Sequence, residues 1–182
     1  IEILGAGLAQ LPPSDWNFKL VGNHEQYLRN SEINNRRLFE HCFNVVDGCA
    51  VFEFGPYMAF FCSFTDDYPE LINWISEGVG EYRDYPKILF GHFQVLGARM
   101  PSGPAVQGVP LEILRYFKLC LLGHIHLPQS LNARVHYVGS PFQQHWGEAG
   151  EAKRVAILDT EDCRVTWVPI SGDPEYRSLS LD

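Results

Sequence analysis

The fold is decided by the stretch Leu119-Cys120-Leu121-Leu122-Gly123-His124-Ile125-His126. Its apolar residues predict a buried strand, and a glycine and two histidines follow at once. In open α/β sheets the ligands lie at the carboxyl ends of the strands, which is where this order places both imidazoles. Alternation would point both rings the same way if the backbone stayed extended. Because imidazole is a common ligand of divalent metals, the stretch predicts a metal site; two exposed loop histidines are the alternative.

Two other apolar segments end in the same way. Residues 17–21 run into Gly22-Asn23-His24-Glu25, and residues 87–90 run into Gly91-His92. Glycine lets the backbone turn sharply and approach an ion or a phosphate closely. Each ending also offers an oxygen or nitrogen ligand. Three such endings in a short chain are hard to explain by packing alone, and they favour a borderline metal such as manganese, iron or zinc.

The rest of the chain mixes helices with strands, which predicts a layered α/β sandwich. We expect helices over residues 1–11, 34–42, 66–78 and 110–116, and strands over residues 43–46, 50–54, 57–61, 135–138, 154–159 and 164–168. Turn dipeptides separate the three strands between residues 43 and 61, which predicts a β-meander. Residues 93–109 are rich in glycine and proline and predict a long active-site loop.

The composition limits the functional classes. A net charge of −8 argues against a free-standing nucleic-acid-binding protein, although bound cations would let an acidic enzyme meet phosphate. The five cysteines lack Cys-x-x-Cys spacing, which predicts buried thiols in a reducing compartment. No apolar run is long enough to span a bilayer, and no secretory signal is visible. We therefore expect a cytoplasmic protein with no membrane partner.

The three motifs resemble the later motifs of the calcineurin-like metallophosphoesterase superfamily, and they occur in that family's order. The segment from Tyr137-Val138-Gly139-Ser140-Pro141 to Trp146-Gly147-Glu148 is most similar to the SbcD-type DNA-repair nuclease branch. The resemblance implies an α/β/β/α metallophosphoesterase sandwich that is incomplete at its N-terminal side. Residues 1–170 would be the C-terminal portion of that domain, and residues 171–182 a tail or linker toward a missing module.

The resemblance also implies roles for individual residues. Asn23, His92 and His124 would ligate one divalent ion, and His126 would ligate a second. His24 would be the catalytic residue that protonates the leaving oxygen or stabilises the transition state, while a hydroxide held between the ions attacks phosphorus. The implied cofactors are two divalent ions, with manganese ahead of iron, zinc and magnesium. Glu25 would orient His24 or a metal ligand; a solvated carboxylate at a helix start is the alternative.

The family's first two motifs are absent from this sequence. Its Asp-x-His strand end and its Gly-Asp, whose aspartate bridges the metals, have no counterpart before Gly22, where Asp15 is the only aspartate. The remaining candidate ligands are all neutral, so the positive charge of two divalent ions would stay largely uncompensated. We expect weak metal binding, and we expect the metal site at His126 to have the lower occupancy of the two. The start at Ile1, inside a helical pattern, predicts that the natural protein has preceding residues; a degenerate, metal-poor relative is the alternative.

The leading hypothesis is a metal-dependent phosphodiesterase, the DNA nuclease subunit of an SbcCD-like repair complex. Its implied partners are a DNA substrate and an SbcC-like ATPase subunit, with a homodimer left open. One alternative is a small-substrate phosphatase or cyclic-nucleotide phosphodiesterase, and another is a non-catalytic scaffold with a degenerate phosphoesterase fold.

Seven other residues carry weaker signals. His41 and His136 are expected to be structural, and His145 is either a substrate contact or a plain loop residue. Contacts to a phosphate backbone, or else ordinary surface charge, are expected of Arg99, Arg134, Lys153 and Arg154.

Overall fold

A six-stranded sheet forms the centre of the computed structural model, which describes residues 17–25, 39–40, 42–100, 103–171 and 176. The helix expected over residues 1–11, most of the one expected over 34–42, and His41 lie outside these residues. The strands of the sheet, in spatial order, are β3 (Cys49–Phe54), β4 (Tyr57–Cys62), β5 (Lys87–Gly91), β8 (Leu119–Leu122), β10 (Val135–Tyr137) and β9 (Gln129–Ser130).

The four inner strands of this sheet are parallel, and β3 and β9 pair antiparallel at its two edges. Parallel strands carry their carboxyl ends to the same edge of a sheet. The ladder also continues past the strands, because the His92 amide donates to the Cys62 carbonyl at 2.9 Å and the Gly123 amide to the Gly91 carbonyl at 2.8 Å. The segments that follow β4, β5, β8 and β10 therefore meet along one edge.

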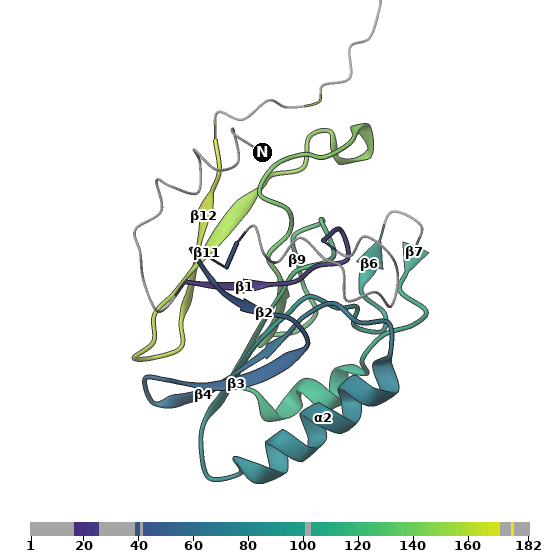
Figure 1. Ribbon diagram of the computed structural model, residues 1–182. Helices are drawn as coiled ribbons and strands as arrows, with labels where there is room; N and C mark the ends of the chain where they lie inside the picture. Colours follow the sequence, from purple (N-terminus) through teal and green to yellow (C-terminus); the bar gives the residue numbers. More distant parts are fainter. Residues whose placement is uncertain (1–16, 26–38, 41, 101–102, 172–175, 177–182) are drawn as a thin grey trace, which may run out of the picture.

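Helices cover one face of the sheet (Figure 1). Helix α2 (Tyr68–Glu81) begins after Asp67, whose carboxylate accepts the Glu70 amide at 3.0 Å and caps the first turn. Beside α2 runs the 3-10 helix η2 (Leu111–Tyr116). All six residues of β4 are buried, and they alternate between this helical side, which receives Phe60, and the opposite side, which receives Phe61.

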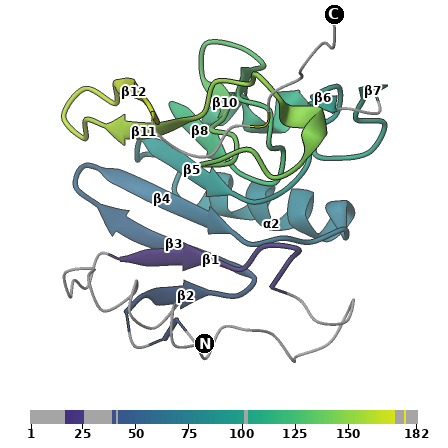
Figure 2. The ribbon, with the colours of Figure 1, turned by 90° about the horizontal axis from the view of Figure 1, so that it is seen from above.

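Two small sheets cover the opposite face (Figure 2). In one of them β1 (Phe18–Leu20) pairs parallel with β2 (Asn44–Val46), and in the other β11 (Arg154–Leu158) pairs antiparallel with β12 (Val165–Pro169). Their apolar side chains pack against the second core cluster. The described residues thus form a mixed α/β protein. The four-layer sandwich stays a prediction.

The predicted β-meander is wrong in its first strand. β3 and β4 do form a hairpin, but β2 pairs with β1 instead of β3. Gly48 takes a left-handed φ of +99° between β2 and β3, which lets the chain leave one sheet and enter the other. The Ser63 hydroxyl, just past β4, donates to the Val46 carbonyl at 2.5 Å. This hydrogen bond links β2 to the end of the central sheet.

The long loop predicted over residues 93–109 contains two short strands, β6 (Arg99–Met100) and β7 (Gly103–Pro104), which pair antiparallel. A further 3-10 turn, η3, spans Trp146–Glu148. The five cysteines are free thiols. None of the helices in the described part of the chain is long and apolar enough to cross a bilayer.

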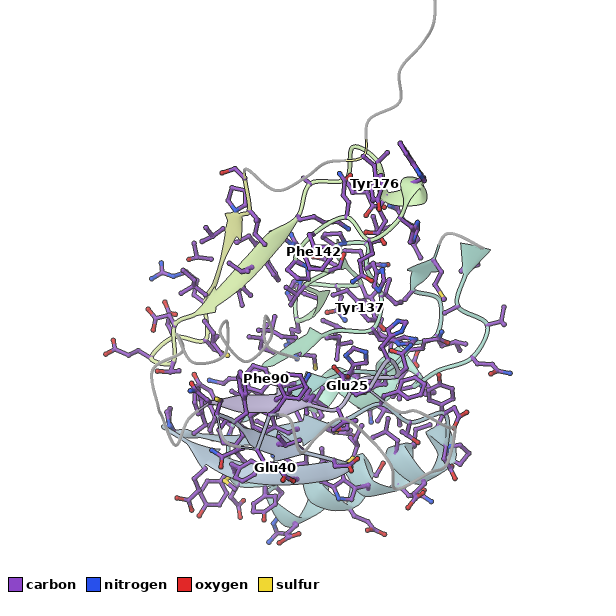
Figure 3. The ribbon with its side chains drawn as sticks, turned by 45° about the horizontal axis from the view of Figure 1, so that its top comes forward. Glu25, Glu40, Phe90, Tyr137, Phe142 and Tyr176 are labelled. Atoms are coloured by element: carbon purple, nitrogen blue, oxygen red, sulfur yellow. The ribbon has the colours of Figure 1, made fainter. Side chains whose placement is uncertain are left out.

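Tyr137 fixes the loop that follows β5 (labelled in Figure 3). Its ring is fully buried, and its hydroxyl accepts the Val95 amide at 2.8 Å and donates to the Phe93 carbonyl at 3.0 Å. Both backbone groups therefore depend on one side chain from a distant strand. Since this loop starts at His92, the hydroxyl also limits where that histidine lies.

We expect Tyr137→Phe to lower the free energy of unfolding by about 1–3 kcal/mol, because it leaves a buried amide and a buried carbonyl without their partner. Urea denaturation followed by circular dichroism measures the loss. Tyr85→Phe is the control, since Tyr85 is exposed and the change should stay within about 0.5 kcal/mol. Equal stability of Tyr137→Phe and the wild type would contradict this role.

Candidate active site

Three of the predicted ligands meet at the carboxyl edge of the central sheet. The Nε2 atom of His92 lies 3.1 Å from the Oδ1 atom of Asn23, and the Nδ1 atom of His124 lies 3.3 Å from the same oxygen. These residues follow β5, β1 and β8 and are up to 101 positions apart in the chain. The strand ends thus bring one amide oxygen and two imidazole nitrogens to a common point.

The end of β1 is held in place by the residues that follow β4. The Ser63 hydroxyl accepts the Val21 amide at 3.2 Å, and the Phe64 amide donates to the Val21 carbonyl at 2.8 Å. Because Gly22 and Asn23 come directly after Val21, these bonds set Asn23 beside His92. The Phe64 ring also lies against the His124 ring, with 5.3 Å between their centroids.

The His92 ring fits between two glycines. A Cβ atom on Gly22 would lie 3.0 Å from the ring, and one on Gly123 would lie 2.9 Å from its Nδ1 atom. The spacing at Gly123 is shorter than real Cβ contacts, and at Gly22 the ring would have to shift by a few tenths of an ångström. The glycines of two sequence motifs are therefore needed here because backbone packs directly against His92, rather than only for sharp turns or for a bound ion.

Burial keeps the two imidazoles neutral. It lowers the pKa of His92 to about 4, and repulsion from His124 adds to the effect. Burial also lowers the pKa of His124, with smaller contributions from His126 and His24. A neutral imidazole has a lone pair to offer a metal, so this environment favours ligation near neutral pH.

His124 and His126 point to different partners. His124 takes a left-handed φ of +78°, which is rare for a residue with a side chain and ends the extended geometry. The alternation that would send both rings the same way is therefore lost. His124 turns toward Asn23, while His126 donates from Nδ1 to the Oε1 atom of Glu148 at 2.7 Å.

Glu148 is a buried anion that holds this second group together. Its Oε1 atom also lies 3.1 Å from the Nε2 atom of His145, and its Oε2 atom accepts from the Lys153 ammonium at 2.8 Å and the Gln144 amide at 3.1 Å. Burial raises the pKa of Glu148, but the hydrogen bonds from Lys153 and His126 outweigh it and bring the pKa to about 2. The carboxylate is therefore ionised near neutral pH.

The ligand atoms of His126, His145 and Glu148 all lie within 4.8 Å of one another, a spacing that a metal ion could bridge. The hydrogen bonds favour another arrangement. The Gly147 amide donates to the Nδ1 atom of His145, so its Nε2 atom carries the proton that faces Glu148. Both nitrogens of His145 are thus engaged, whereas no described residue bonds the Nε2 atom of His126. Glu148 orients His126 in the way that carboxylates orient metal-bound histidines.

Glu25 closes the turn that carries Asn23 and His24 (Glu25 is labelled in Figure 3). Its Oε2 atom accepts the Gly22 amide at 2.6 Å, and its Oε1 atom lies 2.8 Å from the Lys19 ammonium. Its carboxylate therefore shapes the turn, in place of the solvated carboxylate expected as an alternative. His24 is exposed on the same turn.

Cavities surround the two groups. One of about 430 Å³ is lined by Asn23, His24, His92, His124 and His126, so all five predicted site residues face it. A second of about 390 Å³ adjoins Asn23 and His124 and has polar walls that include Tyr68 and Gln94. The site is therefore open to a ligand considerably larger than a single ion.

The chain is similar in sequence to one subunit of each of two nucleases. It is 28% identical over 129 residues to the SbcD component of the nuclease SbcCD from Staphylococcus epidermidis, a match that covers 64% of this chain and 34% of the relative. It is 23% identical over 168 residues to exonuclease subunit 1 of Enterobacteria phage T4, covering 82% of this chain and 44% of the relative. No family model matches the chain.

The chain spans less than half the length of these curated relatives. At this low identity the similarity supports a nuclease-like protein of the hydrolase class. The particular superfamily and the repair complex stay predictions, as do the metal and the roles of single residues.

Sequence reasoning did not identify Glu148, and it predicted the wrong environment for Lys153 and Arg154. Lys153 is neither a phosphate contact nor a surface charge, because it is buried against Glu148 and Glu151. Arg154 stacks on the Trp167 ring at 3.7 Å and donates to the Tyr137 carbonyl at 3.2 Å, so its guanidinium is structural. The one signal for Glu148 is its place in the Trp-Gly-Glu segment that resembles the nuclease branch.

We expect Glu148→Gln to lower the free energy of unfolding by about 2 kcal/mol, because hydrogen bonds to a charged group contribute about 1.5–3 kcal/mol each. The matched control is Glu151→Gln, which removes the more exposed carboxylate on the same lysine and should cost less than about 1 kcal/mol. Urea denaturation at neutral pH compares the two variants. Equal losses would show that Glu148 is not the central anion.

Proposed function

We propose that this chain is part of a metal-dependent phosphodiesterase. The observation that carries the proposal is the convergence of the Asn23 oxygen with the His92 and His124 nitrogens, at 3.1 and 3.3 Å, at a strand edge that borders an open cavity. The similarity to proteins of two nucleases supports the same reaction class. The four-layer metallophosphoesterase sandwich belongs to this proposal, with residues 1–170 as the C-terminal portion of its domain.

The donor set fits a divalent metal ion. Neighbouring ligands that share an ion at about 2.0–2.2 Å lie about 2.8–3.6 Å from one another, and both spacings to the Asn23 oxygen fall in this range. A carboxamide oxygen with two neutral imidazoles suits manganese, iron or zinc better than magnesium. When bound, such an ion supplies a Lewis acid and an activated water.

The remaining side chains have separate tasks in the proposal. His24 reaches the same cavity from an exposed turn, where it can give a proton to the leaving oxygen or stabilise its charge. His126 offers its free Nε2 atom to a second ion, with Glu148 fixing the ring through Nδ1. Glu25 and Lys19 hold the turn on which His24 lies.

We propose DNA as the substrate and an ATPase of the SbcC type as the partner. The support is the similarity to a protein named as a component of the nuclease SbcCD. A partner that grips DNA would also reconcile a net charge of −8 with a polyanionic substrate. Residues 171–182 would lead toward a further module, although the ring of Tyr176 (labelled in Figure 3) packs on Trp146 with 4.8 Å between the ring centroids.

We expect Mn²⁺ to bind this chain and His124→Ala to weaken that binding by more than about 10-fold, since even the loss of a residue that orients a ligand costs about 10- to 100-fold. The loss of the free Mn²⁺ signal in electron paramagnetic resonance measures the affinity. His136→Ala is the control, because His136 bonds Ser130 away from the site. Unchanged affinity in His124→Ala would contradict the ligand assignment, and no binding of millimolar Mn²⁺ by the natural full-length protein would favour the non-catalytic scaffold.

We expect His24→Gln to slow manganese-dependent cleavage of linear DNA by about 10²- to 10⁴-fold, the range typical of a lost general acid. The rate is measured in the natural full-length protein, with His136→Ala as the control for activity. Mn²⁺ affinity should stay unchanged in His24→Gln, because the proposal places His24 outside the ligand set. A wild-type cleavage rate in His24→Gln would contradict the catalytic role.

A substrate panel separates the rival activities. Linear DNA, bis(p-nitrophenyl) phosphate and p-nitrophenyl phosphate present a nucleic acid, a generic diester and a monoester to the same protein. The proposal expects cleavage of the two diesters and little of the monoester. Preference for the monoester would favour the phosphatase.

A further inference from the structure

A cavity of about 670 Å³ lies far from the candidate active site, between α2, η2 and the start of β5. Strand β5 runs from Lys87 at this cavity to Gly91 beside the site, and a five-residue strand is about 16 Å long. This cavity and the candidate active site therefore lie at opposite ends of the same strand. The proposed phosphodiesterase reaction does not use this cavity.

A buried lysine lines this cavity. Lys87 is only 5% exposed, and it shares the helical side of the sheet with Leu89. Its ammonium, which has three N–H donors, donates to the Tyr85 carbonyl at 2.9 Å. Among the described residues, no carboxylate forms an ion pair with it. Burial lowers its pKa, and the more distant charge of Asp84 offsets only part of this effect.

The rest of the lining adds positive charge and aromatic surface. Arg83 and Arg115 line the cavity with one lining carboxylate, that of Glu112, in a chain whose net charge is −8. Arg83 also lies 3.6 Å from the exposed carboxylate of Asp84, which does not line the cavity. The Arg115 guanidinium stacks over the Tyr116 ring at 4.6 Å. Tyr85 and Tyr116 are 56% and 52% exposed, so both rings present aromatic surface beside the cavity.

We propose that this cavity binds a mononucleotide, with its phosphate at Lys87, Arg83 and Arg115 and its base against Tyr85. Lysine and arginine form strong charge-assisted hydrogen bonds with phosphate oxygens, and a phosphate would supply the close counter-ion that Lys87 lacks. A base stacks on tyrosine regardless of its identity. Inorganic phosphate alone would not contact the tyrosine rings, and an apolar ligand would leave the positive charge of Lys87 without a counter-ion.

Isothermal titration of this chain with dAMP tests the proposal. EDTA in the buffer removes metal ions, and a parallel titration of His124→Ala excludes binding at the candidate active site. We expect dAMP to bind His124→Ala as it binds the wild type. Deoxyadenosine and inorganic phosphate should each bind at least about 10-fold more weakly, because each lacks half of the contacts.

Three variants probe the contacts. Lys87→Met keeps the aliphatic stem and removes the charge, so it should weaken dAMP binding at least about 10-fold. Arg115→Gln and Tyr85→Ala alter exposed residues and should weaken binding without loss of the fold, which circular dichroism checks. Arg164→Gln, in the exposed turn between β11 and β12, is the control and should leave the affinity unchanged.

Three results would overturn the proposal. They are no binding of dAMP, whether or not a 5′-phosphorylated oligonucleotide binds; equal binding by wild type and all three variants; and inorganic phosphate binding as tightly as dAMP. None of these results bears on metal binding or on cleavage at the carboxyl edge of the sheet.

Discussion

The His92 imidazole packs directly against backbone on two sides, at Gly22 and at Gly123. This constraint joins three segments that are far apart in the chain. It requires the turn after β1, the end of β5 and the end of β8 to approach within the width of one ring. Hydrogen bonds between neighbouring parallel strands, and the Ser63 hydroxyl between the sheets, keep the three segments at that spacing. The meeting of Asn23, His92 and His124 is a consequence.

The two histidines of the Gly-His-x-His motif serve two groups because one residue leaves the extended geometry. The left-handed φ of His124 directs its ring to Asn23 and frees His126 to face Glu148. Residues with side chains adopt this conformation at a cost, and such strain concentrates at functional sites. Glu148 in turn depends on the Lys153 ammonium for its charge. A strained backbone position and a buried ion pair therefore divide the side chains at one edge into two adjoining groups.

Local patterns in the sequence were sufficient for the strands and for the approximate location of the site. The apolar runs before Gly22, Gly91 and Gly123 predicted buried strands, and strands β1, β5 and β8 are present there. The pairing of the strands was harder to predict. Strand β2 pairs with β1 and not with β3, the next strand in the chain, and the distant Ser63 holds β2 in this position. Glu148 was missed for a similar reason: its role arises from His126, 22 positions away, and from the burial of Lys153. Neither burial nor long-range partners are visible in a short motif.

We propose that Asn23, His92 and His124 share one metal ion. A crystal of the full-length protein soaked in Mn²⁺, with anomalous diffraction recorded to locate the ion, tests this most directly. We expect an anomalous peak about 2.0–2.3 Å from the Asn23 Oδ1, His92 Nε2 and His124 Nδ1 atoms. A peak held by Glu148 and His145 instead, or no peak beside these three atoms at saturating Mn²⁺, would contradict it.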